Sequence, residues 1–341
     1  MKLEGLQAGR AIAALMVAAF HINVFVLPAR LFDGASAWPG FGMGYAGVEF
    51  FFVLSGFIMM LVHVSDFGKP ERSTTFLWKR IVRIYPLYWI VFGALSLLYF
   101  AMPDRGPANA RDPWALISSA LLLPTSQPPI LEVAWTLRHE MLFYLVFLSI
   151  IFNKKFGIVL LCAWQILCIL FVNSDLSFPS KFIFSYYNVL FLFGMLAALG
   201  FRHLTGAKAM IALLFGGAIF FGVGLSEALA GWAWPQGPRT IAYGIGAAFG
   251  VAGLAAGAVR SPAWLGFLGD ASYSVYLTHM PAILMLVAIL VPLGAPWTLD
   301  PLAVMGLLLV WVAIVGGVVH VVVERPLLRQ FKRRRPSATA G

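Results

Sequence analysis

The sequence predicts an all-α integral membrane protein with about ten transmembrane helices, and three observations lead to this fold class. Hydrophobic residues make up 61% of the 341 residues and charged residues only 11%, against about 45–50% and about 25% in soluble domains. Apolar runs of about 17–25 residues, the length that crosses a hydrocarbon core, recur along the whole chain. Ionisable residues nevertheless occur inside these runs, where they are costly and therefore candidates for function.

The apolar runs define ten predicted spans, which we expect to form one transmembrane domain over residues 1–330, followed by a basic cytoplasmic tail over 331–341. The predicted spans are residues 8–27, 43–64, 82–102, 135–152, 156–173, 182–200, 209–227, 239–258, 271–292 and 302–323. Residues 114–124 are apolar but too short to cross, so we expect a re-entrant or interfacial helix there. Asp112-Pro113 before it and Asp300-Pro301 before the last span are typical helix starts.

The distribution of basic residues predicts the orientation of the chain. The net charge is +10, and six of the 24 Lys and Arg residues fall on one side of the predicted spans. Those six are Arg30, Arg105, Arg111, Arg138, Lys181 and Arg239. The other eighteen fall on the side that carries both termini, which is therefore predicted to be cytoplasmic. This reading accounts for the charge without a nucleic-acid partner.

Two further features of the sequence exclude alternatives. The first apolar run contains Arg10 and His21 and lacks a cleavage site followed by a polar mature region, so we expect it to be retained as a span. The cysteines, Cys162 and Cys168, lie six residues apart in one run and face different directions. We therefore expect neither a disulfide nor a metal site.

Arg10 and His21 lie eleven residues apart on the first span. At about 100° per residue they share a face, about 16 Å apart along the helix axis. By residue count Glu49 lies at the depth of His21, and a carboxylate beside an imidazole orients it and stabilises its charged form. A snorkelling arginine with a hydrogen-bonded core histidine, and a structural ion pair for Glu49, are the alternatives.

Two further spans carry polar faces. Thr136, Glu140 and Tyr144 recur every four residues in the fourth span, and an interfacial belt explains Glu140 poorly. Ser272, Tyr276 and His279 share a face of the ninth span, for which a polar seam between helices is the alternative. The other ionisable residues inside the spans or at their ends are Arg138, His139, His320 and Glu324.

A basic cluster of Lys79, Arg80 and Arg83 precedes or opens the third span. It serves either as an ordinary cytoplasmic topology signal or as a site for the phosphates of a donor substrate. Lys332–Arg335, by contrast, is expected to be a solvated tail that touches anionic lipid.

Together these segments resemble the acyltransferase-3 family of bacterial membrane O-acyltransferases. The segments that carry the resemblance are Arg10 with His21, Gly-Val-Glu-Phe-Phe-Phe-Val-Leu-Ser-Gly-Phe at 47–57, Lys-Arg-Ile-Val-Arg-Ile-Tyr-Pro at 79–86, Trp-Thr-Leu-Arg-His-Glu-Met-Leu-Phe-Tyr at 135–144, Gly-Asp-Ala-Ser-Tyr-Ser-Val-Tyr-Leu-Thr-His at 269–279 and Glu-Arg-Pro at 324–326. Each is weak alone, but they occur in the family's order and span nearly the whole chain.

The resemblance implies a cytoplasmic acyl-CoA donor and a carbohydrate hydroxyl acceptor, often reached from the outer side. It implies that Arg10 and His21 are essential and that Arg80 and Arg83 serve the donor. The chain departs from the family in carrying Glu49 where Asp is frequent and Thr at 136 where Ser is frequent. The Trp-Thr-Leu form resembles a subgroup that decorates exopolysaccharides. Some relatives carry a second, extracytoplasmic esterase-like domain. The given sequence ends soon after the last predicted span, so we expect this chain to act alone or with a separate partner.

We therefore expect the protein to transfer an acyl group from acyl-CoA to a hydroxyl of a cell-surface or exopolysaccharide sugar or its lipid-linked precursor. The expected acyl group is acetyl. The expected location is the bacterial cytoplasmic (inner) membrane, with polysaccharide synthesis machinery as a partner. The expected catalytic residues are His21, Glu49, Arg10 and Glu140; the expected donor-binding residues are Arg10, Lys79, Arg80, Arg83, Ser272, Tyr276 and His279. A transporter or proton-coupled carrier, and a structural membrane partner, are the competing classes.

Overall fold

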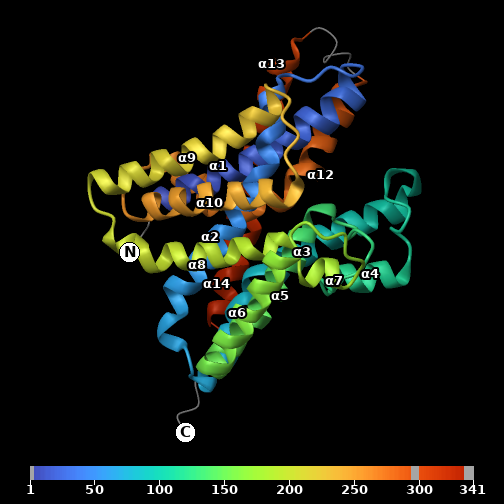
Figure 1. Cartoon of the computed structure of the whole chain (residues 1–341). Coiled ribbons are helices and arrows are strands. Elements are labelled where there is room, and N and C mark those ends of the chain that lie inside the picture. Colours follow the sequence, from blue (N-terminus) through green and yellow to red (C-terminus); the bar gives the residue numbers. More distant parts are fainter. Residues whose placement is uncertain (1–3, 293–298, 334–341) are drawn as a thin grey trace. The chain divides into compact units, whose positions relative to one another are not determined.

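The computed structural model describes residues 4–292 and 299–333. Every regular element within those residues is a helix, and no strand occurs among them (Figure 1). The prediction of an all-α fold is confirmed for this part of the chain.

The chain divides into two compact units. Unit 1 comprises Met1–Leu61 and Leu190–His320, and unit 2 comprises Val62–Val189 and Val321–Gly341. The predicted boundary between a domain ending at 330 and a tail stays a prediction. The last described helix, α14, continues across that boundary to Arg333, and residues 334–341 lie outside the described part.

Unit 1 contains most of the long helices. They are α1 (Glu4–His21), the π-helix η1 (Ile22–Leu31), the 3-10 helix η2 (Pro39–Ala46), α2 (Gly47–His63), α8 (Val189–Gly200), η8 (Phe201–His203), α9 (Ala207–Ala228), α10 (Gln236–Ala255), α11 (Ala263–Asp270), α12 (Ser272–Leu290) and α13 (Pro301–Val319). The last two residues of α2, Val62 and His63, and the first residue of α8, Val189, belong to unit 2. Asp300 caps α13 by accepting from the Leu302 N–H at 2.8 Å, as the sequence predicts.

Unit 2 contains the remaining helices. They are η3 (Val64–Asp66), η4 (Pro70–Arg72), α3 (Ser73–Ala101), η5 (Pro103–Arg105), α4 (Pro113–Ala120), η6 (Glu132–Ala134), α5 (Trp135–Phe152), α6 (Lys154–Leu170), α7 (Ser180–Ile183), η7 (Tyr186–Asn188) and α14 (Arg325–Arg333), with η10 (His320–Glu324) leading into α14. The third predicted span begins too late, because α3 starts at Ser73 and already contains the basic cluster.

Within the described part of the chain, eight helical stretches are long and apolar enough to cross a membrane, against the ten predicted. They are Glu4–Leu31, Pro39–Asp66, Pro70–Ala101, Glu132–Phe152, Ser180–His203, Ala207–Ala228, Ser272–Leu290 and Pro301–Phe331. The fifth and eighth predicted spans correspond to α6 and α10. Both are helical, but α6 has only 17 residues, and α10 combines polar first turns with many glycines and alanines.

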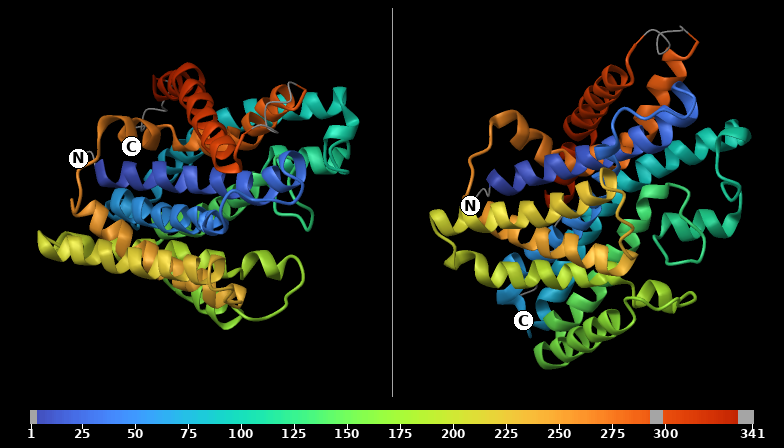
Figure 2. Two further views of the ribbon diagram at one scale, coloured as in Figure 1. Left: turned by 90° about the horizontal axis from the view of Figure 1, so that it is seen from above. Right: turned by 45° about the horizontal axis from the view of Figure 1, so that its top comes forward.

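Helix α1 lies at the centre of unit 1 and defines the direction of its neighbours. A Cβ on Gly47 would lie 2.4 Å from the Ala13 oxygen, and one on Gly9 would lie 2.7 Å from the Phe50 ring, so α2 runs antiparallel to α1. Gly269 approaches the Gln7 backbone, whereas His279 approaches His21, so α12 runs parallel to α1. Figure 2 shows these helices from two further sides.

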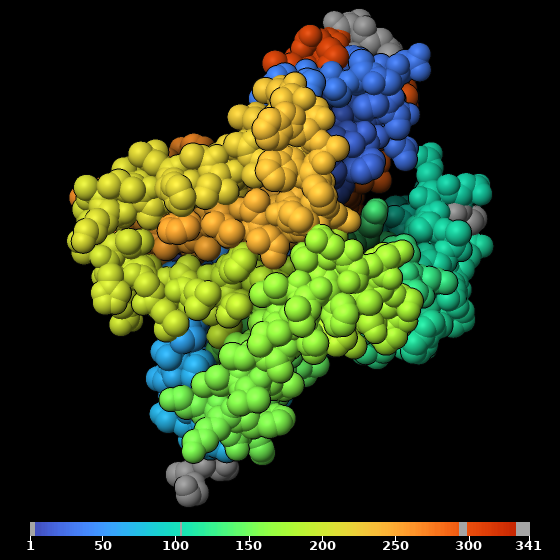
Figure 3. All heavy atoms as spheres, in the orientation of Figure 1, coloured from blue at the N-terminus to red at the C-terminus, as the bar shows by residue number. Residues whose placement is uncertain are grey.

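Small residues let the helices of unit 1 approach closely, as is typical where lipid surrounds a protein. A Cβ on Gly194 of α8 would lie 1.8 Å from the Val53 oxygen of α2. Gly216 of α9 meets the Gly246 oxygen of α10 in the same way, at 2.5 Å. Figure 3 shows α9 and α10 packed along their length. This hairpin brings the end of α9 to the start of α10.

In unit 2, side chains of α3 hold α4 by its last carbonyl groups. The Tyr88 hydroxyl donates to the Ser119 carbonyl oxygen at 2.6 Å, and the Trp89 indole N–H donates to that of Ala120 at 2.8 Å. The Tyr85 hydroxyl donates to the Leu121 carbonyl oxygen at 3.0 Å. A helix end has no intrahelical partners for these groups, so α3 supplies them. At the other end, Asp112 accepts from the Trp114 and Ala115 N–H groups, which confirms the predicted helix start.

Candidate functional site

His21 and His279 lie side by side in unit 1, with their ring centres 4.9 Å apart. His21 Nδ1 is 2.8 Å from the Val17 carbonyl oxygen, and His279 Nδ1 is 2.6 Å from the Tyr276 carbonyl oxygen. A carbonyl oxygen can only accept, so each neutral ring carries its proton on Nδ1 and its lone pair on Nε2. His279 Nε2 then faces His21 Nδ1 at 3.4 Å as a second acceptor.

The lone pair of the neutral His21 ring therefore lies on Nε2. His21 is half-buried, at the last residue of α1, and the π-helix η1 begins directly after it. π-Helical turns often occur at functional sites. Aromatic rings surround the two imidazoles: Phe20 and Phe25 lie 5.3 and 5.8 Å from His21, and Tyr276 lies 5.9 Å from His279. The site therefore combines a base with largely apolar walls.

Arg10 lies in the first half of α1, eleven residues before His21, and Ser272 is the first residue of α12. Arg10 Nη1 donates to Gln7 Oε1 at 3.1 Å, and the Gln7 backbone packs against Gly269, which is close to Ser272 in sequence. Ser272 is buried, and its Oγ finds no hydrogen-bond partner within the described residues. The sequence-predicted residues of unit 1 therefore occupy two levels along α1.

The predicted match in depth between Glu49 and His21 is wrong. The contacts of α2 with Ala13 and Gly9 place Glu49 beside the middle of α1, whereas His21 ends that helix. The segment before α2 is the 3-10 helix η2, and a 3-10 helix rises about 2.0 Å per residue, so the chain is deeper by residue 49 than a count predicts. The charged groups that act on the buried Glu49 carboxyl are Arg239 and Glu227.

Those two residues belong to a polar cluster that the sequence analysis missed. Glu227 Oε2 accepts from the Tyr45 hydroxyl at 2.5 Å and from the Tyr243 hydroxyl at 3.4 Å, and Glu227 Oε1 accepts from Arg239 at 3.1 Å. The Arg239 guanidinium also lies 4.8 Å from the centre of the Tyr45 ring. The sequence held one signal of this cluster: the acidic Glu227 ends one apolar run, and the basic Arg239 opens the next. From the sequence, Arg239 was expected only to be a basic residue on the outer side of the membrane.

The basic cluster lies in unit 2, where Arg83 forms an ion pair. Arg83 Nη1 donates to Glu324 Oε1 at 2.6 Å, and Glu324 is 2% exposed against 33% for Arg83. Glu324 lies in the Glu-Arg-Pro segment, so two segments of the resemblance meet here. From the sequence, Arg83 was expected to bind the acyl-CoA donor, and its pairing with Glu324 was not predicted.

Arg80 is held by a second set of contacts in unit 2. Its Nη2 lies 3.3 Å from His63 Nε2, and His63 Nδ1 lies 2.8 Å from Asp66 Oδ2. The guanidinium also lies 5.6 Å from the centre of the Tyr144 ring, and the Tyr144 hydroxyl donates to Glu140. Glu140 and Tyr144 thus share a helix face as predicted. The His63–Asp66 pair, three residues apart, was missed.

Lys79 differs from its two neighbours because it is exposed. It lies on α3 with Arg80 and Arg83, so the three basic residues follow one stretch of helix. Of the three, Lys79 can be replaced with the least disturbance to the buried contacts of unit 2.

His139 belongs to a buried hydrogen-bond network that holds part of unit 2 together. Its Nδ1 lies 2.9 Å from Asn188 Oδ1, and Asn188 Nδ2 donates to the Phe182 and Ile183 carbonyl oxygens. Gln165 Nε2 donates to the Asn188 carbonyl at 3.2 Å, which closes a buried network. Among the described residues no group of three His, Cys, Asp or Glu side chains is placed to hold a metal ion.

Comparison with known proteins decides the family. A family model described as an acyltransferase domain, Acyl_transf_3, matches residues 3–322. The chain belongs to the acyltransferase-3 family. It is therefore an acyltransferase, which sets aside the transporter and structural-partner alternatives.

Two curated relatives agree with this assignment. The exopolysaccharide production protein ExoZ of Rhizobium meliloti (strain 1021) is 32% identical over 322 residues, which cover 87% of this chain and 94% of ExoZ. The acyltransferase MdmB of Streptomyces mycarofaciens is 27% identical over 378 aligned positions, covering 100% of this chain and 95% of MdmB. No solved structure matches the chain.

The Arg83–Glu324 pair makes a prediction about stability. Arg83→Ala should destabilise the protein by about 3–5 kcal/mol, because it leaves the buried Glu324 carboxylate without this partner. Arg83→Ala combined with Glu324→Ala should cost clearly less than the sum of the two single variants. Thermal unfolding of the four proteins in detergent measures this coupling.

The exposed pair of Lys181 and Asp175, 3.7 Å apart, is the matched control. Lys181→Ala should leave the unfolding midpoint unchanged, since exposed ion pairs contribute little. Additive losses for Arg83 and Glu324 would show that the pair is not coupled.

Proposed function

We propose that this acyltransferase transfers an acetyl group from acetyl-CoA to a hydroxyl of an exopolysaccharide sugar or of its lipid-linked precursor. The observation that carries the proposal is the His21–His279 pair, which leaves a basic nitrogen at His21 Nε2. Family membership supports acyl transfer, and the name of ExoZ as an exopolysaccharide production protein supports this acceptor class.

The proposed reaction is direct transfer with His21 as general base. His21 Nε2 takes the proton of the acceptor hydroxyl while that oxygen attacks the thioester carbonyl carbon. The tetrahedral intermediate collapses, the carbon–sulfur bond breaks, and the imidazolium returns its proton to the departing CoA thiolate. The products are the O-acetyl ester and CoA.

His279 acts as the positioning residue for this base. When His21 is protonated, its Nδ1–H still meets two acceptors, the Val17 carbonyl and His279 Nε2. The charged ring is therefore stabilised without changing its orientation. This reassigns His279 from the donor site, where the sequence placed it, to the base. Glu49 keeps a proposed electrostatic role through the Arg239 and Glu227 cluster.

Donor binding is assigned to basic residues. Lys79 and Arg80 are the proposed ligands of the acyl-CoA phosphates, since guanidinium and ammonium groups bind phosphates well. Arg10 remains a proposed donor-binding residue. Arg83 contributes through its pairing with Glu324. Ser272 and Tyr276 remain proposed donor contacts, and Glu140 a proposed member of the catalytic set that orients Tyr144.

The proposed setting is the bacterial inner membrane, with both termini cytoplasmic and α6 and α10 counted as the fifth and eighth of ten spans. The asymmetry of basic residues supports this orientation. The relative directions of the neighbours of α1 agree with alternation of the spans, since α2, the second span, runs antiparallel to α1 and α12, the ninth, runs parallel to it. Polysaccharide synthesis machinery is the proposed partner that supplies the acceptor.

The base is tested by His21→Ala. Transfer of radiolabelled acetyl from acetyl-CoA into the polysaccharide or lipid-linked fraction of membranes should fall by about 10²–10⁴-fold, the usual loss for a positioned base. The level of protein in the membrane should not change. His203→Ala, which removes an exposed histidine, is the control and should retain full activity. Normal turnover by His21→Ala would exclude the proposed base.

Donor binding is tested by Lys79→Ala. If Lys79 binds a CoA phosphate equally in the ground and transition states, the variant should raise KM for acetyl-CoA by about tenfold or more and leave kcat unchanged. Arg72→Ala, which removes an exposed basic residue just before α3, is the control for net charge. Equal changes in KM for both variants would show that Lys79 does not bind the donor, and the basic cluster would then serve only to orient the chain in the membrane.

A further inference from the structure

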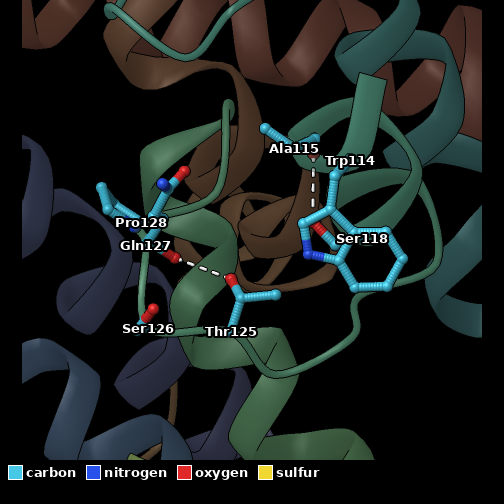
Figure 4. Close-up of a pocket in the computed structure, with 7 residues that line it drawn as sticks. All are labelled: Trp114, Ala115, Ser118, Thr125, Ser126, Gln127 and Pro128. Atoms are coloured by element: carbon cyan, nitrogen blue, oxygen red, sulfur yellow. Dashed lines mark hydrogen bonds between the residues drawn. The ribbon is translucent and has the colours of Figure 1, made fainter. Parts of the chain in front are cut away.

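The loop between α3 and α5 of unit 2 encloses a hollow of about 90 Å³ that the proposed chemistry does not use. One wall comes from α4 and the other from the segment that follows it (Figure 4). The lining residues are Trp114, Ala115 and Ser118 on α4, and Thr125, Ser126, Gln127 and Pro128 opposite.

The lining combines one large aromatic ring with hydroxyl and amide groups. Trp114 is 59% exposed and presents its indole beside the hollow. The Ser118 and Thr125 hydroxyls already donate to the Ala115 and Gln127 carbonyls, so they offer lone pairs to a ligand. The Ser126 hydroxyl and the Gln127 amide can also donate. A sugar ring has C–H faces that stack on an aromatic ring and an edge of hydroxyls that need such partners. None of the described residues that line the hollow is charged, so the lining matches a neutral sugar ring.

The walls are already fixed by hydrogen bonds. The Gln127 carbonyl accepts from Thr125 Oγ1 at 2.9 Å and from Arg138 Nη1 at 3.0 Å. Asn109 Nδ2 donates to the Pro128 carbonyl at 3.3 Å and to Gln127 Oε1 at 3.4 Å. The second of these contacts orients the Gln127 amide so that its NH₂ group remains a donor. The ligand therefore meets a preorganised surface, which lowers the entropy lost on binding.

The surface of α4 indicates where the sugar comes from. Trp114, Ile117 and Leu121 are 59%, 51% and 49% exposed and recur at helical spacing, so they form one apolar stripe. Such a stripe on a short helix is typical of a membrane interface. A hollow next to it is placed for a sugar that is carried at the membrane surface by a lipid.

We propose that this hollow is a carbohydrate subsite that holds a sugar ring of the acceptor, with the ring stacked on Trp114 and its hydroxyls bound by Gln127 and Thr125. The inference rests on the proposed function for the identity of the acceptor. Binding itself needs neither acetyl-CoA nor His21, so it can fail or succeed independently of the proposed reaction.

The test measures sugar binding by saturation-transfer NMR on the full-length protein in nanodiscs. The ligands are the methyl glycosides of glucose, galactose, mannose and glucuronic acid. At least one neutral glycoside should bind the wild-type protein and His21→Ala equally. Trp114→Ala should weaken that binding about tenfold, and Gln127→Ala about fivefold.

Three controls make the outcome decisive. Trp232→Ala removes a tryptophan that is 60% exposed in unit 1 and should leave binding unchanged. Ile117→Ser alters the apolar stripe and should also leave glycoside binding unchanged, which separates a lipid anchor from a sugar site. Thermal unfolding of each variant checks that it is folded. Absence of binding to every glycoside, or equal binding by wild type, Trp114→Ala and Gln127→Ala, would overturn the proposal.

Discussion

The hydrogen bond from His21 Nδ1 to the Val17 carbonyl decides which nitrogen of that imidazole can accept a proton. Because the acceptor is backbone of the preceding helical turn, continuous α-helix up to residue 21 holds the ring. Rotation of the ring would require loss of this bond and of the contact with His279. The turn of α1 before His21 and the packing of α12 on α1 therefore fix the His21 ring in one tautomer and in one orientation, which the sequence alone does not show.

Ionisable groups within a bilayer persist only where protein satisfies them, and this separates the predicted residues into two kinds. His139 and Arg83 have partners, Asn188 and Glu324, that account for much of their burial. His21 has partners for Nδ1 that orient the ring and make Nε2 the nitrogen that takes a proton. The contacts of His139 and Arg83 thus stabilise the fold, whereas the contacts of His21 suit the chemistry proposed for it.

The helices were largely predictable because their signals are local. Apolar runs and the caps at Asp112 and Asp300 depend on nearby residues, and both caps form as expected. The errors have distant or geometric causes. The 3-10 helix before Glu49 alters the rise per residue, and the pairing of Arg83 with Glu324 joins residues 241 positions apart. A sequence pattern carries no measure of either effect. The tautomer of His21 likewise required the positions of two carbonyl oxygens.

The most direct test of this account compares two replacements of His279 in steady-state acetyl transfer. His279→Leu removes the acceptor that faces His21 Nδ1, so kcat should fall by at least about tenfold, while KM for acetyl-CoA stays unchanged because donor binding is assigned elsewhere. His279→Gln places an amide oxygen within reach of the same N–H and should recover part of that loss. A wild-type kcat in His279→Leu, or a rise in KM alone, would contradict the role given to the histidine pair.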